Sequence, residues 1–222
     1  MSLIEQQAIN NLVTQAKTAV PQWQATSIDS RLAILSQCNA KFISHLEPIA
    51  REKLTTPIEL PGPTGEDNRL SLHGRGPMVL IVREQDPLEV AEQQIISALL
   101  CGCPVIVVAD RAHQLAIEGL QDKYQQAGLA KSVLQKAPMQ NLSELIENNS
   151  VEGVIANSLN KNSTDLRQVI AKRTGSIIPL IEWPETVESF HYHWLLSFLS
   201  ERTRTENLVA RGGNTQLFNL AE

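Results

Sequence analysis

Two short, uninterrupted apolar runs, at residues 78–82 and 105–108, constrain the fold more than any other feature of this chain. Such runs are typical of strands buried on both faces of a parallel sheet, because neither side of the strand then meets water. The segment between them has the signals of a helix over residues 88–100, with Asp86 as its expected cap and Gly102 as its stop. A strand, a helix and a strand within about thirty residues predict a right-handed crossover unit.

The same alternation continues to about residue 200. It predicts a helix at 113–126, a weaker strand at 132–134, a helix at 142–148, a strand at 151–156, a helix at 164–172, a strand at 177–181 and a last helix at about 187–200. The expected fold class is therefore α/β. We expect a Rossmann-like, open and mostly parallel sheet with helices on both faces, forming a body over residues 69–200.

An N-terminal helical arm is expected over residues 1–56. Apolar side chains recur at helical spacing from Ile4 to Val20, which predicts one amphipathic helix. A second helix follows with a broad apolar stripe, for which Asp29 is the expected cap and Pro48 a potential kink.

Residues 57–68 form a joint between this arm and the body. Its prolines remove backbone donors and its glycines admit turns, which excludes a helix or a central strand. A short edge strand is expected directly afterwards, at residues 70–73. The joint motif consists of Pro61, Gly62, Pro63, Thr64, Gly65 and Asn68.

The last part of the chain, residues 201–222, is an unusual ending for a globular domain. Residues 202–209 alternate like a strand ribbon, and the pair Gly212 and Gly213 interrupts the pattern before a further apolar stretch. A strand, a flexible kink and a second apolar stretch suit a partner surface. The alternative is an ordinary C-terminal hairpin that covers its own core, and the pattern alone leaves both open.

Composition excludes several functional classes. The formal net charge of −5 and the absence of any Lys/Arg run oppose nucleic acid as a partner. The cysteines, Cys38, Cys101 and Cys103, are odd in number, which opposes a disulfide framework and favours a reducing cytoplasm. We expect neither a signal peptide nor a transmembrane segment, because no stretch is apolar for long enough.

The loops at the carboxyl ends of the strands carry little recognisable chemistry. Residues 83–87 contain no glycine that would let the backbone approach a pyrophosphate, so the Rossmann fingerprint is absent. Asp110 could hold a ribose, but it is preferred as a helix cap. The loop 157–163 could offer amides and hydroxyls to a phosphate, and Ser163 is just as plausibly the cap of the next helix. Cys101 and Cys103 are interpreted as small apolar core residues, so the residues alone predict a scaffold without an active site.

Several segments resemble a known superfamily. Residues 75–82 and 86–108 resemble the first crossover of the aldehyde dehydrogenase cofactor domain, and the helix that begins at 30–35 resembles that superfamily's N-terminal helices. More specifically, the segments 60–72, 202–207 and 212–217, the last reading Gly-Gly-Asn-Thr-Gln-Leu, are similar to the C-terminal domain of the proline utilization A family.

This resemblance implies a function without catalysis in this chain. Family members oxidise proline to glutamate with an FAD-dependent proline dehydrogenase and an NAD-dependent semialdehyde dehydrogenase. The C-terminal domain packs on the semialdehyde dehydrogenase domain, supports its activity and helps to seal the tunnel that carries the intermediate. Carried over, the docking residues are Gly212, Gly213, Asn214, Thr215, Leu217, Phe218 and Leu220. We also expect a second contact, a homodimer formed through residues 201–222.

Departures from the catalytic superfamily agree with this expectation. Ala109 and Asp110 stand where active relatives carry a lysine for the adenosine ribose, and residues 182–185 replace the motif with the general base. No segment resembles the nucleophile motif. We therefore assign no catalytic, metal-binding or cofactor-binding residue to this chain and place FAD and NAD in the parent protein. The alternative is a residual NAD-binding module or weak dehydrogenase, in which changes at Asp110 or Ser158 would abolish NAD binding.

Overall fold

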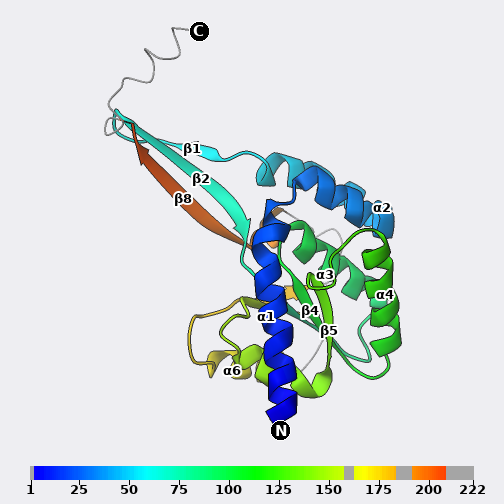
Figure 1. Ribbon diagram of the computed structural model, residues 1–222. Coiled ribbons are helices and arrows are strands. Elements are labelled where there is room, and N and C mark those ends of the chain that lie inside the picture. Colours follow the sequence, from blue (N-terminus) through cyan, green and yellow to red (C-terminus); the bar gives the residue numbers. More distant parts are fainter. Residues whose placement is uncertain (1–2, 158–162, 184–191, 209–222) are drawn as a thin grey trace.

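The computed structural model describes residues 3–157, 163–183 and 192–208 (Figure 1). Its centre is a five-stranded parallel sheet with the strand order β5-β4-β3-β6-β7. The strands are β3 (Met78–Val82), β4 (Val105–Ala109), β5 (Leu134–Pro138), β6 (Gly153–Asn157) and β7 (Leu180–Trp183). Every residue of β3 and β4 is buried, so the prediction of a parallel sheet built on these two runs is confirmed.

Helices cover both faces of this sheet, because successive strand side chains point to opposite sides. Leu80 and Val107 face a core shared with α2 (Ile28–Leu54), α3 (Leu88–Leu100) and α4 (Gln114–Gln126). Val79 and Val108 face a second core shared with α1 (Leu3–Ala25), α5 (Leu142–Glu147) and α6 (Ser163–Ala171). The short 3-10 helix η1 (Met139–Asn141) leads into α5. The predicted α/β class, with an open parallel sheet and helices on both faces, is confirmed.

Two strands lie further along the chain than their patterns predicted. The middle strand was expected at 132–134, but β5 begins at Leu134, where Gln135 and Lys136 break the apolar run. The last strand was expected from residue 177, but β7 begins at Leu180, and Ile177 is 99% exposed. The apolar pattern therefore assigned Ile177 to the strand, although its side chain is exposed and lies before β7.

The first helix, α1 (Leu3–Ala25), runs past its predicted end and contains Pro21. Proline removes one backbone donor, but the turn beyond it continues because Trp23 is buried against the end of α3, where its Nε1 donates to the Leu99 carbonyl. Tertiary packing outweighs the helix-breaking tendency of the proline here.

The second helix, α2 (Ile28–Leu54), is capped two residues earlier than predicted. Ser27 is its N-cap and accepts from the Ser30 N–H over 3.1 Å, so Asp29 already lies inside the helix. The helix kinks at Asn39, with φ −149° and ψ 77°, rather than at the expected Pro48. Asn39 Oδ1 accepts from the Phe42 N–H over 3.1 Å and thereby caps the second half of the helix.

A second, three-stranded antiparallel sheet projects from the body; we call it the flap (Figure 1). It has the order β1-β2-β8, with β1 (Ile58–Leu60), β2 (Glu66–Gly74) and β8 (Leu199–Asn207). Residues 58–60 of the joint form an edge strand, which agrees with the prediction that the joint contains no central strand. The turn after this strand contains Gly65 at φ 94°.

Two expectations for the flap were wrong. The short edge strand at 70–73 is part of the nine-residue β2, which lies in the centre of the flap between β1 and β8. The last helix was expected to reach residue 200, but α7 (Tyr192–Leu196) ends earlier, and Ser200 already pairs with His73 in the flap. Pairing between distant segments extended both strands beyond what their local patterns indicated. The predicted ribbon from residue 202 is confirmed through Asn207.

Candidate functional site at the sheet edge and the flap base

Ligands bind at the carboxyl ends of the strands in open α/β sheets, and in this protein two carboxylates follow β3 and β4 there. Asp86 Oδ2 accepts from the Arg83 N–H over 2.7 Å, and Asp110 Oδ2 accepts from the Glu84 N–H over 3.0 Å. Each carboxylate therefore stabilises the loop after β3 by accepting a backbone N–H.

Neither aspartate caps a helix as predicted. The N-cap positions of α3 and α4 are Pro87 and His113, and neither side chain forms a capping hydrogen bond. Asp110 is turned away from α4 because a tight turn, with the His113 N–H donating to the Asp110 carbonyl over 2.9 Å, separates the two. Its carboxylate instead ties together the loops that follow two neighbouring strands.

The pocket next to this edge is small. It has a volume of about 140 Å³ and is lined by side chains of β4, β5 and α4, among them Ile117 and Lys136. Small-molecule sites usually measure roughly 300–1,000 Å³, so this hollow is too small to enclose a dinucleotide. Ser158, the second residue named for NAD binding, lies outside the described residues.

Large aromatic side chains fill the carboxyl end of β7. Trp183 is buried and packs edge to face on Trp194, with ring centroids 4.7 Å apart, and also contacts Phe42 at 6.4 Å. Glu182 lies within β7 rather than after it and forms an ion pair with Arg167 of α6. The position that was compared with a general base therefore holds a carboxylate engaged with a cation.

The thiols of Cys38, Cys101 and Cys103 are free and buried, as predicted for core residues. Cys103 Sγ donates to the Phe198 carbonyl over 3.3 Å, and burial raises the pKa of Cys103 to about 11. Burial also raises the pKa of Cys101 well above its ordinary value. Neither thiol is therefore an activated nucleophile. Within the described residues, no group of three or more His, Cys, Asp or Glu side chains gathers as a metal site.

Almost no side chain of the flap is fully buried, and many are only partly exposed. Among its strand residues only Gly74 and Leu199, at the root, are buried. Over the described ranges β8 is an outer strand, with β2 on one side and no strand on the other. Arg69 and Arg204 lie opposite each other in the register, and each forms an ion pair with an acidic residue two positions away on its own strand.

The seven predicted docking residues, from Gly212 to Leu220, lie outside the described part of the chain, which ends at Leu208. The joint motif lies partly within the flap: Asn68 is in β2, where it pairs with Leu60 and Thr205.

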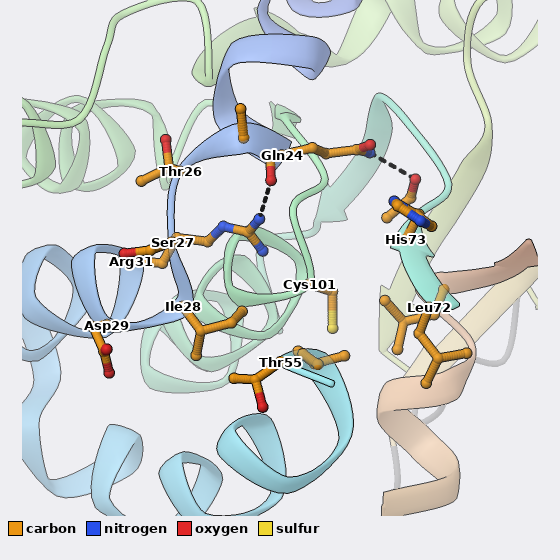
Figure 2. A pocket seen from close by; sticks show the side chains of 14 residues that line it. Gln24, Thr26, Ser27, Ile28, Asp29, Arg31, Thr55, Leu72, His73 and Cys101 are labelled. Atoms are coloured by element: carbon orange, nitrogen blue, oxygen red, sulfur yellow. Dashed lines mark hydrogen bonds between the residues drawn. The ribbon is translucent and has the colours of Figure 1, made fainter. Parts of the chain in front are cut away.

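A larger pocket of about 350 Å³ lies where the flap meets the helical arm (Figure 2). We call it the flap-base pocket. The turn between α1 and α2, the end of α2, the root of β2 and β8, and the turn after α3 all contribute to it. Its walls include Gln24, Arg31, Leu72, His73 and Cys101.

Arg31 is the buried charge of this pocket. It is only 7% exposed, and its guanidinium donates to the carbonyls of Leu100 and Gln24 over 2.9 and 2.8 Å. Sequence reasoning missed Arg31. The available signal was its place among the buried positions Ile28, Leu32 and Leu35, where a charged side chain needs a partner.

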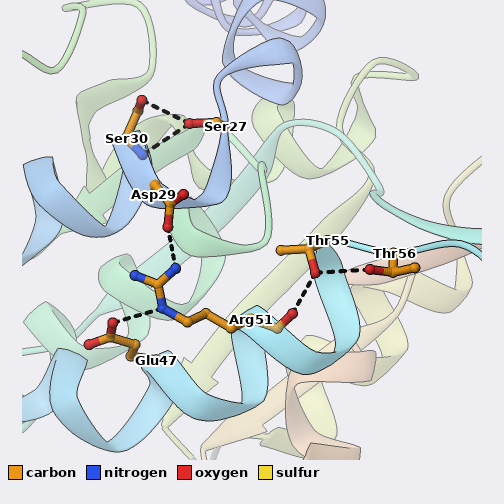
Figure 3. Close-up of polar contacts among 7 residues, drawn as sticks. All are labelled: Ser27, Asp29, Ser30, Glu47, Arg51, Thr55 and Thr56. Atoms are coloured by element: carbon orange, nitrogen blue, oxygen red, sulfur yellow. Dashed lines mark hydrogen bonds and ion pairs between the residues drawn. The ribbon is translucent and has the colours of Figure 1, made fainter.

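An ion network joins the start and the end of α2 (Figure 3). Arg51 bonds to both Asp29 and Glu47, and the three side chains are all well exposed. Thr55 Oγ1, one turn further on, donates to the Arg51 carbonyl. Of these residues, Asp29 and Thr55 also line the flap-base pocket.

Comparison with known proteins identifies the fold. No protein family model and no curated protein matches the chain. Solved structures do match, and they assign the fold to the aldehyde dehydrogenase type; one is an NAD-dependent benzaldehyde dehydrogenase from Corynebacterium glutamicum, with a TM-score of 0.63 and 16% identity over 79% of this chain and 46% of that one.

Structures of proline utilization A are also among these neighbours. One with proline bound in remote sites has a TM-score of 0.71 and 21% identity, and a variant from Bradyrhizobium japonicum has a TM-score of 0.72 and 22% identity. Both comparisons cover 80% of this chain but only 22% of the other, so the matched part of this chain spans about a fifth of the length of those proteins. None of the described helices is long and apolar enough to cross a membrane.

Proposed function

We propose that this chain is a non-catalytic, aldehyde-dehydrogenase-like domain of a proline-catabolic enzyme. In this proposal it packs on the NAD-dependent semialdehyde dehydrogenase domain of the parent protein, supports its activity and assembly, and helps to seal the tunnel for the reactive intermediate. FAD and NAD belong to the parent's catalytic domains, and the whole acts in the cytoplasm.

The flap is the single observation that carries this proposal. Over the residues that the structure describes, the flap has three strands, almost no fully buried side chain and the nine-residue β8 as an outer strand. Such a sheet is a poor structure for an isolated domain, since outer strands invite pairing with another chain. Such an edge suits a neighbouring domain or a second copy of the chain. The tail that follows β8 then extends this contact with Gly212, Phe218 and their neighbours.

The sheet edge supports the absence of catalysis in this proposal. Asp86 and Asp110 are used to close the loops where a cofactor would bind, and Trp183 fills the end of β7. The Rossmann-like sheet and the likeness to an NAD-dependent dehydrogenase favour the competing reading, a residual NAD-binding module. The cofactor-binding module would bind NAD, whereas the non-catalytic domain would bind the parent enzyme.

Two calorimetric titrations separate them. NAD is titrated into this chain, and the chain is titrated into the parent enzyme from which this domain has been deleted. We expect no NAD heat and micromolar association with the truncated enzyme. Saturable NAD binding that is lost in Asp110→Ala, without association, would favour the cofactor-binding module.

Tail deletion tests the docking residues in the full-length enzyme. Removing residues 209–222 should impair semialdehyde oxidation and channelling but leave proline oxidation intact. The matched control removes only Ala221 and Glu222 and should behave like the unaltered enzyme. Unchanged coupled kinetics after the longer deletion would contradict a docking role for the tail.

A further inference from the structure

The two sides of the flap differ in their chemistry. Ile58, Leu70 and Thr203 stand opposite one another in the register, so their side chains share one side of the sheet. Leu60 and Leu72, two positions along the same strands, lie on this side as well. We call it the aliphatic face of the flap. None of its aliphatic side chains is fully buried, and only Leu72 is packed against the described core of the body.

The other side of the flap is charged. Arg69 lies opposite Arg204, and Asp67 lies opposite Glu206. Ion pairs along each strand, from Arg69 to Asp67 and from Arg204 to Glu206, partly offset these like-charged neighbours. An antiparallel sheet with one charged and one aliphatic side usually turns the aliphatic side toward other protein atoms. The aliphatic face is therefore the side of the flap that gains most from being covered.

The chain itself continues from the tip of the flap, where β8 ends (Figure 1). The Leu208 N–H donates to the Gly65 carbonyl over 2.8 Å, which holds the end of β8 beside the turn between β1 and β2. Fourteen residues, 209–222, follow this point. Because a strand rises about 3.3 Å per residue, residues 214–220 are long enough to run back along β8 from Asn207 to Glu201.

The order of residues in this tail fits such a return. If Asn214 stands opposite Asn207 in an antiparallel pairing, the turn consists of residues 208–213 and contains both Gly212 and Gly213. The same register puts Phe218 opposite Thr203, on the aliphatic face of the flap. A shift by one residue would move Phe218 to the charged side, so the apolar pattern selects one register.

We propose that the outer edge of β8 binds the chain's own tail, with residues 214–220 antiparallel to β8 and Phe218 and Leu220 on the aliphatic face. The same chain is favoured over a second copy, because a segment joined to β8 by a short turn has a high effective concentration at that edge. This inference goes beyond the proposed function and does not depend on it. In the parent enzyme, the flap and the tail would meet the neighbouring domain as one surface.

Hydrogen exchange of the β8 amides tests the pairing. Alternate N–H groups of β8 point to its outer edge, and the others point to β2. Removing residues 209–222 should speed exchange of the outer amides at least about ten-fold and leave the amides bonded to β2 much less affected. The control removes only Ala221 and Glu222. Equal exchange of the outer amides in the two deletions would refute the proposal, and protection that rises with protein concentration would replace the tail by a second copy.

A pair of cysteine variants tests the register without altering any apolar residue. Thr205 and Gln216 stand opposite each other in the proposed pairing, whereas Thr205 and Thr215 point to opposite sides of the sheet. Under mild oxidation, Thr205→Cys/Gln216→Cys should form an intramolecular disulfide at least about ten-fold faster than Thr205→Cys/Thr215→Cys. The two loops differ by one residue, so an unpaired tail would give nearly equal rates and contradict the pairing. A disulfide between two copies would also overturn it.

Discussion

Trp23 Nε1 donates a hydrogen bond of 3.0 Å to the carbonyl of Leu99, and Arg31 Nη1 donates one of 2.9 Å to the next carbonyl, that of Leu100. α1 and α2 thus each satisfy one carbonyl in the last turn of α3, where the helix carries partial negative charge. The Arg31 guanidinium also lies 5.8 Å from the centre of the Trp23 ring. The helical arm is therefore fixed to the body at the point where α3 ends.

Arg31→Met should lower the free energy of unfolding by about 2–3 kcal/mol, because two carbonyls lose a charged donor. Arg31→Lys should recover only part of this, since an ammonium cannot span both carbonyls as a guanidinium does. Urea unfolding measures the effect. The control, Arg111→Met on the exposed surface, should change stability by less than about 0.5 kcal/mol. Equal values for positions 31 and 111 would contradict the bridging role.

Three glycine substitutions separate backbone strain from crowding. Gly102 has φ +85°, and an added Cβ would lie 3.2 Å from Arg31 Nη1, so Gly102→Ala should cost about 2 kcal/mol or more. Gly128 has φ +101° in open space, so Gly128→Ala should cost only about 1 kcal/mol. Gly119 is helical with open space, and Gly119→Ala should stabilise by about 0.5–1 kcal/mol. Thermal unfolding gives the order, and any other ranking would contradict this account.

His73 should make stability depend on pH. Burial and the nearby Arg202 lower the pKa of His73, so the folded state binds its proton more weakly than the unfolded state does. The stability that neutral His73 contributes is present above about pH 6.5 and is lost as the pH falls through the lowered folded-state pKa. The melting temperature should therefore fall between about pH 7.5 and 5. His73→Gln should remove the part of this fall that His73 causes, and Arg202→Gln should reduce it. A steeper pH dependence in His73→Gln would show that the sign is wrong.

The thiols should resist alkylation in the folded protein. Cys103, with its pKa raised to about 11 by burial, and Cys101 lack both the thiolate form and access to a reagent at neutral pH. Mass spectrometry after iodoacetamide treatment should show no native labelling at these two positions and full labelling in urea. Rapid native labelling of either residue would mean that the turn after α3 opens readily.

The parallel sheet was predictable because each of its central strands carries its own signal. A strand buried on both faces is apolar throughout. The strands at 78–82 and 105–108 could therefore be predicted without knowing which strands lie beside them. The flap was harder. β2 alternates weakly, and its length is set by pairing with β8 rather than by its own residues.

Site residues were predicted less well, since their roles depend on neighbours from other segments. Asp110 follows a strand and precedes a helix, which fits a cap, but its carboxylate accepts the N–H of Glu84 on another loop. Arg31 has a role only through Leu100 and the pocket wall, which the sequence does not place beside it. Local patterns report helix and strand faces, whereas these contacts are set by the tertiary structure.

The pairing of β2 with β8 sets the order in which this protein can fold. Gly74 meets Leu199, and Glu66 meets Asn207, so the central strand of the flap leaves the ribosome long before its main partner. All strands of the parallel sheet lie between the two in sequence, and that sheet can assemble first. A nascent chain therefore carries β2 with an open edge until β8 has been synthesised, and termination within β8 leaves a folded body with a strand prone to aggregation.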